Sequence, residues 1–101
     1  MMLALRADLI AEEAAETVAA IRAGDMIETI DGLCDLIYVC IGAAVCFGVP
    51  LQPFWDEVHE SNMRKGDGPM RADGKRLKPE GWQGPRIAEL YAELVRQRGE
   101  E

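Results

Sequence analysis

Apolar residues recur with helical periodicity along most of the chain, among strong helix formers such as Ala, Leu and Glu. The pattern predicts an all-α protein whose helices span residues 3–23, 26–47, 52–64 and 86–98. The second of these is apolar nearly all round, whereas the last is amphipathic. An apolar helix of this kind needs cover on more than one side.

Glycine and proline mark the ends of the two long helices. Gly24 ends the first helix, and Asp25 is the expected N-cap of the second. Gly48 and Val49 end the second, because Val49 precedes a proline. Two long helices joined by a tight turn predict an antiparallel hairpin, the natural unit of a four-helix bundle. We expect a second copy of the chain to complete the bundle, as a homodimer or homotetramer.

Residues 66–85 hold five Gly and three Pro and are expected to form a long loop or lid. Such a loop is too long to be an idle connection in a compact domain. At this length we expect one domain, residues 1–101, in which the loop and a C-terminal helix follow the hairpin.

Three carboxylates follow one narrow stripe of the apolar second helix. Glu28, Asp31 and Asp35 are three and four residues apart, so they share one face. An unpaired carboxylate among apolar neighbours is costly or has a shifted pKa. The stripe therefore requires a compensating partner.

The first helix carries its own acids in the segment EEAAE. In an antiparallel hairpin, Glu16 comes level with Asp31, and Glu12 or Glu13 with Asp35. Facing carboxylates repel one another, and Mg²⁺, which prefers oxygen ligands, is the plausible compensator. Glutamates three apart are also common on solvated helices, so the metal interpretation depends on both helices together. An iron-carboxylate site is excluded, because the single histidine forms no Glu-x-x-His pair.

The predicted loop concentrates positive charge on an acidic protein. Six of the eleven Lys and Arg residues lie between positions 64 and 78, within this loop or directly before it: Arg64, Lys65, Arg71, Lys75, Arg76 and Lys78. We predict phosphate contacts from Asn62, Lys65, Lys75 and Lys78. The alternative is a solvated, flexible loop. Trp82 either stacks on a base or pins the loop, and the sequence leaves both open.

Composition limits the kinds of partner and the cellular compartment that we expect for the protein. A formal charge of −7 argues against binding nucleic-acid polymers. The apolar run over residues 36–49 is short of the roughly 20 residues that span a bilayer, so no membrane association is expected. An odd number of cysteines, Cys34, Cys40 and Cys46, indicates reduced, buried thiols in a cytoplasmic protein.

Catalytic motifs of other classes do not occur in the sequence. There is no P-loop and no GxSxG nucleophile motif. The nucleophile is therefore expected to be water that attacks a phosphoanhydride.

The order of these motifs resembles the all-α nucleoside triphosphate pyrophosphohydrolases, which include the MazG-like enzymes and the phosphoribosyl-ATP pyrophosphohydrolases. EEAAE, the turn, DGLCDLIYV, HESNMRK and DGKRLKPEGW carry the resemblance over about residues 6–87. It implies an oligomeric helical fold and Mg²⁺-dependent cleavage between the α- and β-phosphates, which yields a monophosphate and pyrophosphate. Mn²⁺ is the alternative metal.

Mapping the family's motifs onto the chain identifies the candidate site residues. The first motif, ExxE, falls on Glu13 and Glu16, and Glu12 is our candidate to orient or deprotonate the water. The aspartate of the second falls on Asp35, but its glutamate falls on Gly32. Asp31 is the natural substitute and Glu28 the lesser alternative.

The sequence predicts a cytoplasmic, Mg²⁺-dependent nucleotide pyrophosphohydrolase. The alternative is a non-catalytic helical module of the same fold that binds a nucleotide or a protein, which the glycine at position 32 favours. Phosphoribosyl-ATP, dUTP and ordinary NTPs all remain open as substrates, as do dimer and tetramer.

Overall fold

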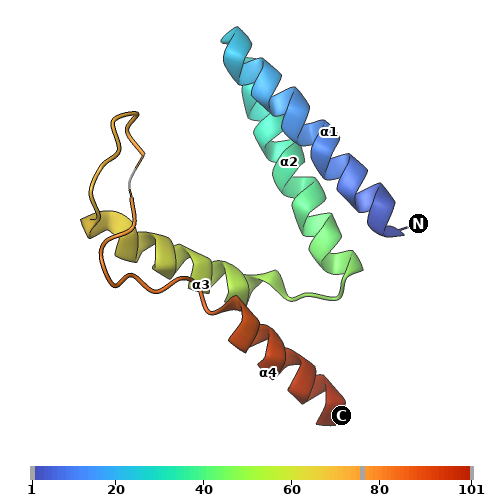
Figure 1. Ribbon diagram of the computed structural model, residues 1–101. Helices are drawn as coiled ribbons and strands as arrows, with labels where there is room; N and C mark the ends of the chain where they lie inside the picture. The colour runs from blue at the N-terminus through green and yellow to red at the C-terminus, as the bar shows by residue number, and fades with distance from the viewer. Residues whose placement is uncertain (1, 76, 101) are drawn as a thin grey trace. The chain divides into compact units, whose positions relative to one another are not determined.

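The computed structural model describes residues 2–75 and 77–100 (Figure 1). The helices are α1 (Met2–Ala23), α2 (Met26–Cys46), α3 (Leu51–Arg64), the 3-10 turn η1 (Lys65–Asp67) and α4 (Ile87–Glu100). No strand occurs within the described ranges. The predicted all-α class is confirmed, and the predicted helix ends agree with the observed ones to within two residues.

The chain divides into two compact units, residues 1–51 and 52–101. We call them the hairpin unit and the loop unit and describe each by itself. The single-domain organisation over residues 1–101 stays a prediction.

In the hairpin unit, α1 and α2 run antiparallel side by side (Figure 1, blue and green). Gly24 adopts φ 71°, a left-handed conformation that costs glycine little and ends α1. The side chain of Asp25 accepts a hydrogen bond from the backbone N–H of Glu28 at 3.1 Å and so caps α2. The tight turn predicted from these two residues is therefore present.

The interface between α1 and α2 is built from small residues. Thr17, Ala20, Gly32 and Ala43 are buried there. The large apolar side chains of α2 remain exposed, and Ile27 and Tyr38 keep 77% and 79% of their surface accessible. One α1 helix covers only part of α2, which is apolar nearly all round, so most of the apolar surface of α2 is left open.

The cysteine prediction needs a correction. Cys34 and Cys40 are exposed and Cys46 is half-buried, and all three are free thiols. They lie on a helix that is apolar nearly all round, and α1 covers only part of it. The expectation of buried thiols is therefore wrong for the single chain.

In the loop unit, the chain after η1 doubles back on itself without forming a helix (Figure 1). The backbone N–H groups of Leu77 and Arg71 donate to the carbonyls of Pro69 and Lys75, each at 2.6 Å. The start of α4 is joined to α3, because the N–H of Arg86 donates to Oε1 of Glu57 at 3.1 Å. The loop predicted over residues 66–85 is thus an ordered arm, of which Arg76 lies outside the described residues.

Candidate functional site

Thr17 of α1 and Gly32 of α2 are packed closely against each other. A Cβ atom built on Gly32 would lie 2.6 Å from Thr17 Oγ1 and 3.2 Å from Thr17 Cα. Thr17 is only 3% exposed, and its hydroxyl donates to the carbonyl of Glu13 at 2.6 Å. Any larger residue at position 32 would therefore force the two helices apart.

This contact sets the register of the hairpin. Glu13 lies one turn before Thr17 on α1, and Asp35 lies about one turn after Gly32 on the antiparallel α2. Towards the open end of the hairpin, Nη1 of Arg6 on α1 lies 3.1 Å from the position that a Cβ atom of Gly42 on α2 would take. This pairing of Arg6 with Gly42 agrees with the same register. Glu13 and Asp35 thus occupy matching levels on the two helices.

Glu13 is the centre of the acidic group. Its side chain is half-buried, and Oε2 is buried with no hydrogen-bond partner among the described residues. Burial raises the pKa of the Glu13 carboxyl above its ordinary 4.5, and the charges of Glu16, Asp35, Glu12 and Asp31 raise it further. Carboxylates from both helices therefore act on one buried oxygen.

The surrounding acids are exposed and remain separate. Among residues 2–75 and 77–100, no three His, Cys, Asp or Glu side chains converge closely enough to hold a metal ion. Glu12, Glu16, Glu28, Asp31 and Asp35 are all exposed, and Glu28 does not contribute to the shift of Glu13. The roles of these residues and of Glu13 as ligands stay a prediction.

Their chemistry nevertheless fits a divalent cation. Mg²⁺ is held by oxygen ligands and usually by only one or two carboxylates together with phosphate oxygens. Glu13 offers an oxygen that no described residue satisfies by a hydrogen bond, and the charges of four other carboxylates act on it. A bound cation would supply the missing partner and offset the repulsion.

The structure explains why a glutamate at position 32 is incompatible with this hairpin. Gly32 faces the backbone of Thr17, so a side chain there has no space. Asp31 and Asp35 lie on either side of it and both act on Glu13. Sequence reasoning missed the role of Thr17; the available signal was a glycine in the interior of a helix, where glycine usually has a packing reason.

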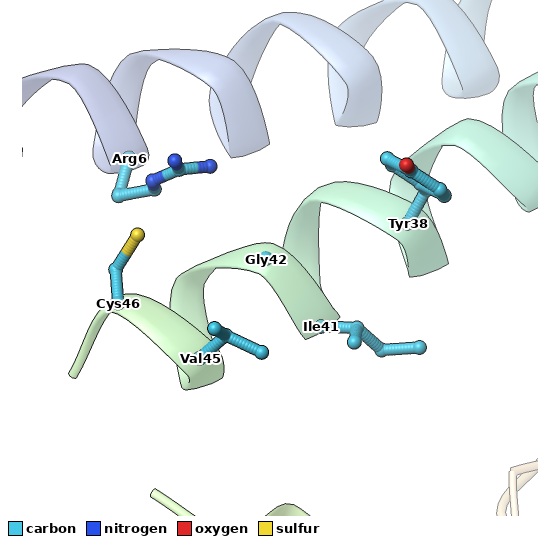
Figure 2. A pocket seen from close by; sticks show the side chains of 6 residues that line it. All are labelled: Arg6, Tyr38, Ile41, Gly42, Val45 and Cys46. Atoms are coloured by element: carbon cyan, nitrogen blue, oxygen red, sulfur yellow. The ribbon is translucent and has the colours of Figure 1, made fainter. Parts of the chain in front are cut away.

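A further feature is a hollow at the open end of the hairpin (Figure 2). Its volume is about 480 Å³, and it is lined by Arg6, Tyr38, Ile41, Gly42, Val45 and Cys46. The guanidinium of Arg6 lies against the last turns of α2, where the helix dipole favours a cation. Figure 2 shows Cys46 pointing towards α1. Because Ile41 and Val45 are exposed, the hollow continues into the apolar surface of α2.

In the loop unit, Trp82 is fixed in place. Its Nε1–H donates to the carbonyl of Ser61 at 2.9 Å, and the Nζ atoms of Lys65 and Lys78 lie 5.2 and 5.0 Å from the ring centroid. These contacts favour the alternative in which Trp82 pins the loop. Asn62 and Lys75 are exposed.

The titration of Glu13 predicts a measurable effect on stability in the metal-free protein. A carboxyl with a raised folded-state pKa stabilises the fold fully below the unfolded value of 4.5, and this contribution is lost as the pH rises through the folded-state pKa. Glu13→Gln should therefore melt at a higher temperature than the wild type at about pH 7, and the difference should shrink at about pH 5.

Thermal melts in EDTA measure this difference. Glu93 is the matched control, because its hydrogen bond with Arg96 lowers the pKa of the Glu93 carboxyl. The stabilising contribution of Glu93 is present above 4.5 and is lost as the pH falls through the lowered pKa. Glu93→Gln should therefore be destabilising at about pH 7. If Glu13→Gln and Glu93→Gln shifted the melting temperature in the same direction, the raised pKa of Glu13 would be refuted.

Comparison with known proteins identifies the family of the part of the chain that contains the helical hairpin. The family model of phosphoribosyl-ATP pyrophosphohydrolase matches residues 1–62, which cover the hairpin unit and most of α3. No curated protein matches the chain. Because the family model covers more than half of its length, the chain belongs to the phosphoribosyl-ATP pyrophosphohydrolase family, within the MazG-like all-α NTP pyrophosphohydrolase superfamily.

Proposed function

We propose that the protein is a Mg²⁺-dependent nucleotide pyrophosphohydrolase. It hydrolyses the α–β phosphoanhydride of a nucleoside triphosphate or related nucleotide to a monophosphate and pyrophosphate. Family membership supports pyrophosphohydrolase activity in general. The observation that carries the metal-dependent form is the buried, unpartnered Glu13 oxygen among four other carboxylates.

Glu13, Glu16, Asp31 and Asp35 are the residues that would hold the metal, with Glu28 as the lesser candidate and Mn²⁺ as the alternative ion. When bound, the ion supplies positive charge that offsets the phosphate oxygens and the facing carboxylates. Asp31 takes the place of the family glutamate, because Gly32 has no room for one.

The chain's own residues would perform the proton transfer. Glu12 is exposed beside Glu13 and is the candidate general base. It accepts a proton from water as the water oxygen bonds to phosphorus and the bond from phosphorus to the bridging oxygen breaks. Asn62, Lys65, Lys75 and Lys78 are the proposed contacts to phosphate oxygens.

The exposed apolar face of α2 supports self-association. By length and composition alone, α2 could cross a membrane. Its acids Glu28, Asp31 and Asp35 would be costly in a bilayer but useful beside a metal. We therefore propose that a second copy covers α2, in a cytoplasmic homodimer or homotetramer without membrane or nucleic-acid partners.

Placing a charge on this face should dissociate the oligomer. Ile37 is 60% exposed in the single chain, and Ile37→Glu would bury an unpaired carboxylate at the proposed interface. Light scattering should give twice or four times 11.1 kDa for the wild type and a single chain for the variant. Ala19→Glu, at an exposed position of α1, should keep the wild-type mass. A monomeric wild type would rule out the second copy.

A nucleotide panel tests the proposed activity. The protein is incubated with NTPs, dNTPs and phosphoribosyl-ATP in Mg²⁺, and pyrophosphate is measured beside an EDTA control. We expect release from at least one nucleotide, and none in EDTA. No release from any of them by a folded protein would instead favour the second candidate, a non-catalytic binding module. The observation that favours this module is that the described acids do not converge on one point.

A further inference from the structure

The Trp82 ring joins two segments that are distant in the sequence. Its Nε1–H donates to the Ser61 carbonyl at the C-terminal half of α3, and this bond fixes the indole. The Nζ atoms of Lys65, which begins η1, and of Lys78, in the returning arm, lie 5.2 and 5.0 Å from its centroid. Each ammonium is attracted to the ring by a cation–π interaction.

The two lysines differ from the arginines around them. Arg64 pairs with Glu57 at 3.8 Å, and Nε of Arg71 donates to Asp73 at 2.9 Å, so neighbouring acids offset these charges. Within the described part of the chain, no carboxylate pairs with Lys65 or Lys78. The indole attracts both cations but does not neutralise them.

The shared ring also keeps these cations close together. Their separation cannot exceed 10.2 Å, the sum of their two distances from the one ring centroid. Two ammonium ions held at this range repel each other, and a doubly charged anion that contacts both would relieve that repulsion. Ammonium groups are effective point charges for phosphate oxygens.

We propose that Lys65 and Lys78, held over Trp82, form a binding site for a diphosphate group. Trp82 is a positioning residue, since it holds the two cations and its ring is already covered by them. This rests on the proposed function and deepens it, because it assigns a ligand class, a diphosphate, to the proposed phosphate contacts Lys65 and Lys78. Lys78 and Trp82 lie beyond the residues matched by the family model.

The test is calorimetric titration of the full chain with inorganic pyrophosphate in EDTA. We expect saturable binding, and about tenfold weaker binding of AMP, which offers only one phosphate. Lys65→Met and Lys78→Met should each weaken pyrophosphate binding about tenfold, since methionine keeps an apolar stem over the ring without the charge. Arg22→Met, which removes one positive charge from α1, should leave the affinity unchanged.

Two sets of variants distinguish a specific site at Trp82 from nonspecific attraction by the positive charge of the loop. Lys75 is exposed in the same arm, and Lys75→Met should cost less affinity than either ring lysine. Trp82→Leu should weaken binding about as much as losing a lysine, whereas Trp82→Phe, which keeps an aromatic face, should retain part of the affinity. Equal losses for all three lysines, or absence of saturable binding, would overturn the site.

The pyrophosphate-binding experiment and the hydrolysis assay test the two proposals separately. Pyrophosphate binding without nucleotide turnover would keep this site and reject the proposed enzyme. Turnover that is unaffected in Lys65→Met and Lys78→Met, together with no pyrophosphate binding, would reject this site and keep the enzyme.

Discussion

Gly32→Glu, which restores the glutamate of the family motif, is expected to damage the hairpin unit rather than to improve a metal site. The new side chain would begin 2.6 Å from Thr17 Oγ1 and 3.2 Å from Thr17 Cα, and a backbone atom cannot rotate away. Overpacking of this kind typically costs 1–3 kcal/mol, and a buried carboxylate adds to it, so the melting temperature should fall by about 10 °C or more.

A double-mutant cycle tests whether the loss of stability comes from the contact between Thr17 and position 32. Gly32→Ala adds only a Cβ and should destabilise less than glutamate does. In a Thr17→Ala background, which removes the hydroxyl nearest to that Cβ, the cost of Gly32→Ala should be smaller again. Thermal melts of the four proteins give the coupling. A Gly32→Glu protein as stable as the wild type would show that the helices are spaced differently from this structure.

Asp35→Asn is expected to abolish turnover while leaving the fold intact. Asp35 is exposed and lies level with Glu13, whose pKa its charge helps to raise. The substitution removes a proposed metal ligand and relieves repulsion in the metal-free protein. We expect kcat to fall by about 100-fold or more, the range found when one electrostatic contribution to the transition state is lost.

The matched control is Asp8→Asn, which removes an exposed carboxylate of α1 outside the acidic group. Its kcat should stay within about twofold of the wild type. The melting temperature of Asp35→Asn without metal should not fall, because no hydrogen bond of Asp35 is lost among the described residues. Near-wild-type turnover in Asp35→Asn would refute the ligand assignment.

The helix ends could be predicted from sequence because they depend on local chemistry. Gly24 and Asp25 determine the turn through a positive φ and an N-cap, and both features need only neighbouring residues. The order of acids on α1 and α2 then follows from helical spacing. A tight turn is then enough to predict which acids of α1 lie opposite which acids of α2.

The burial of these acids could not be predicted in the same way. Glu13 is half-buried with an unpartnered oxygen, whereas Glu12 and Glu16, its neighbours in EEAAE, are exposed. Which glutamate of this segment turns inward depends on which face of α1 packs against α2. The Thr17–Gly32 contact determines that face, and it joins residues from different helices.

In the loop unit too, some features could be predicted from the sequence and others required the tertiary structure. Composition predicted a basic arm without helix, because Gly and Pro disfavour one wherever the chain runs. Composition could not show which Lys and Arg side chains are paired with a carboxylate and which are not. Arg64 pairs with Glu57 and Arg71 with Asp73, whereas no carboxylate pairs with Lys65, Lys75 or Lys78 among the described residues; of these three lysines, Lys65 and Lys78 are the two that lie over Trp82.

The sequence alone therefore determined the helical class, the hairpin, the acidic and basic segments and the family. Periodicity, caps and turn residues act over a few positions and need no knowledge of distant contacts. Only the tertiary structure decided that Gly32 is a contact point rather than an empty ligand position, and that Trp82 holds two lysines. The Thr17–Gly32 and Lys65–Trp82 contacts join residues that are remote in the chain, and side-chain packing rather than local propensity sets their distances.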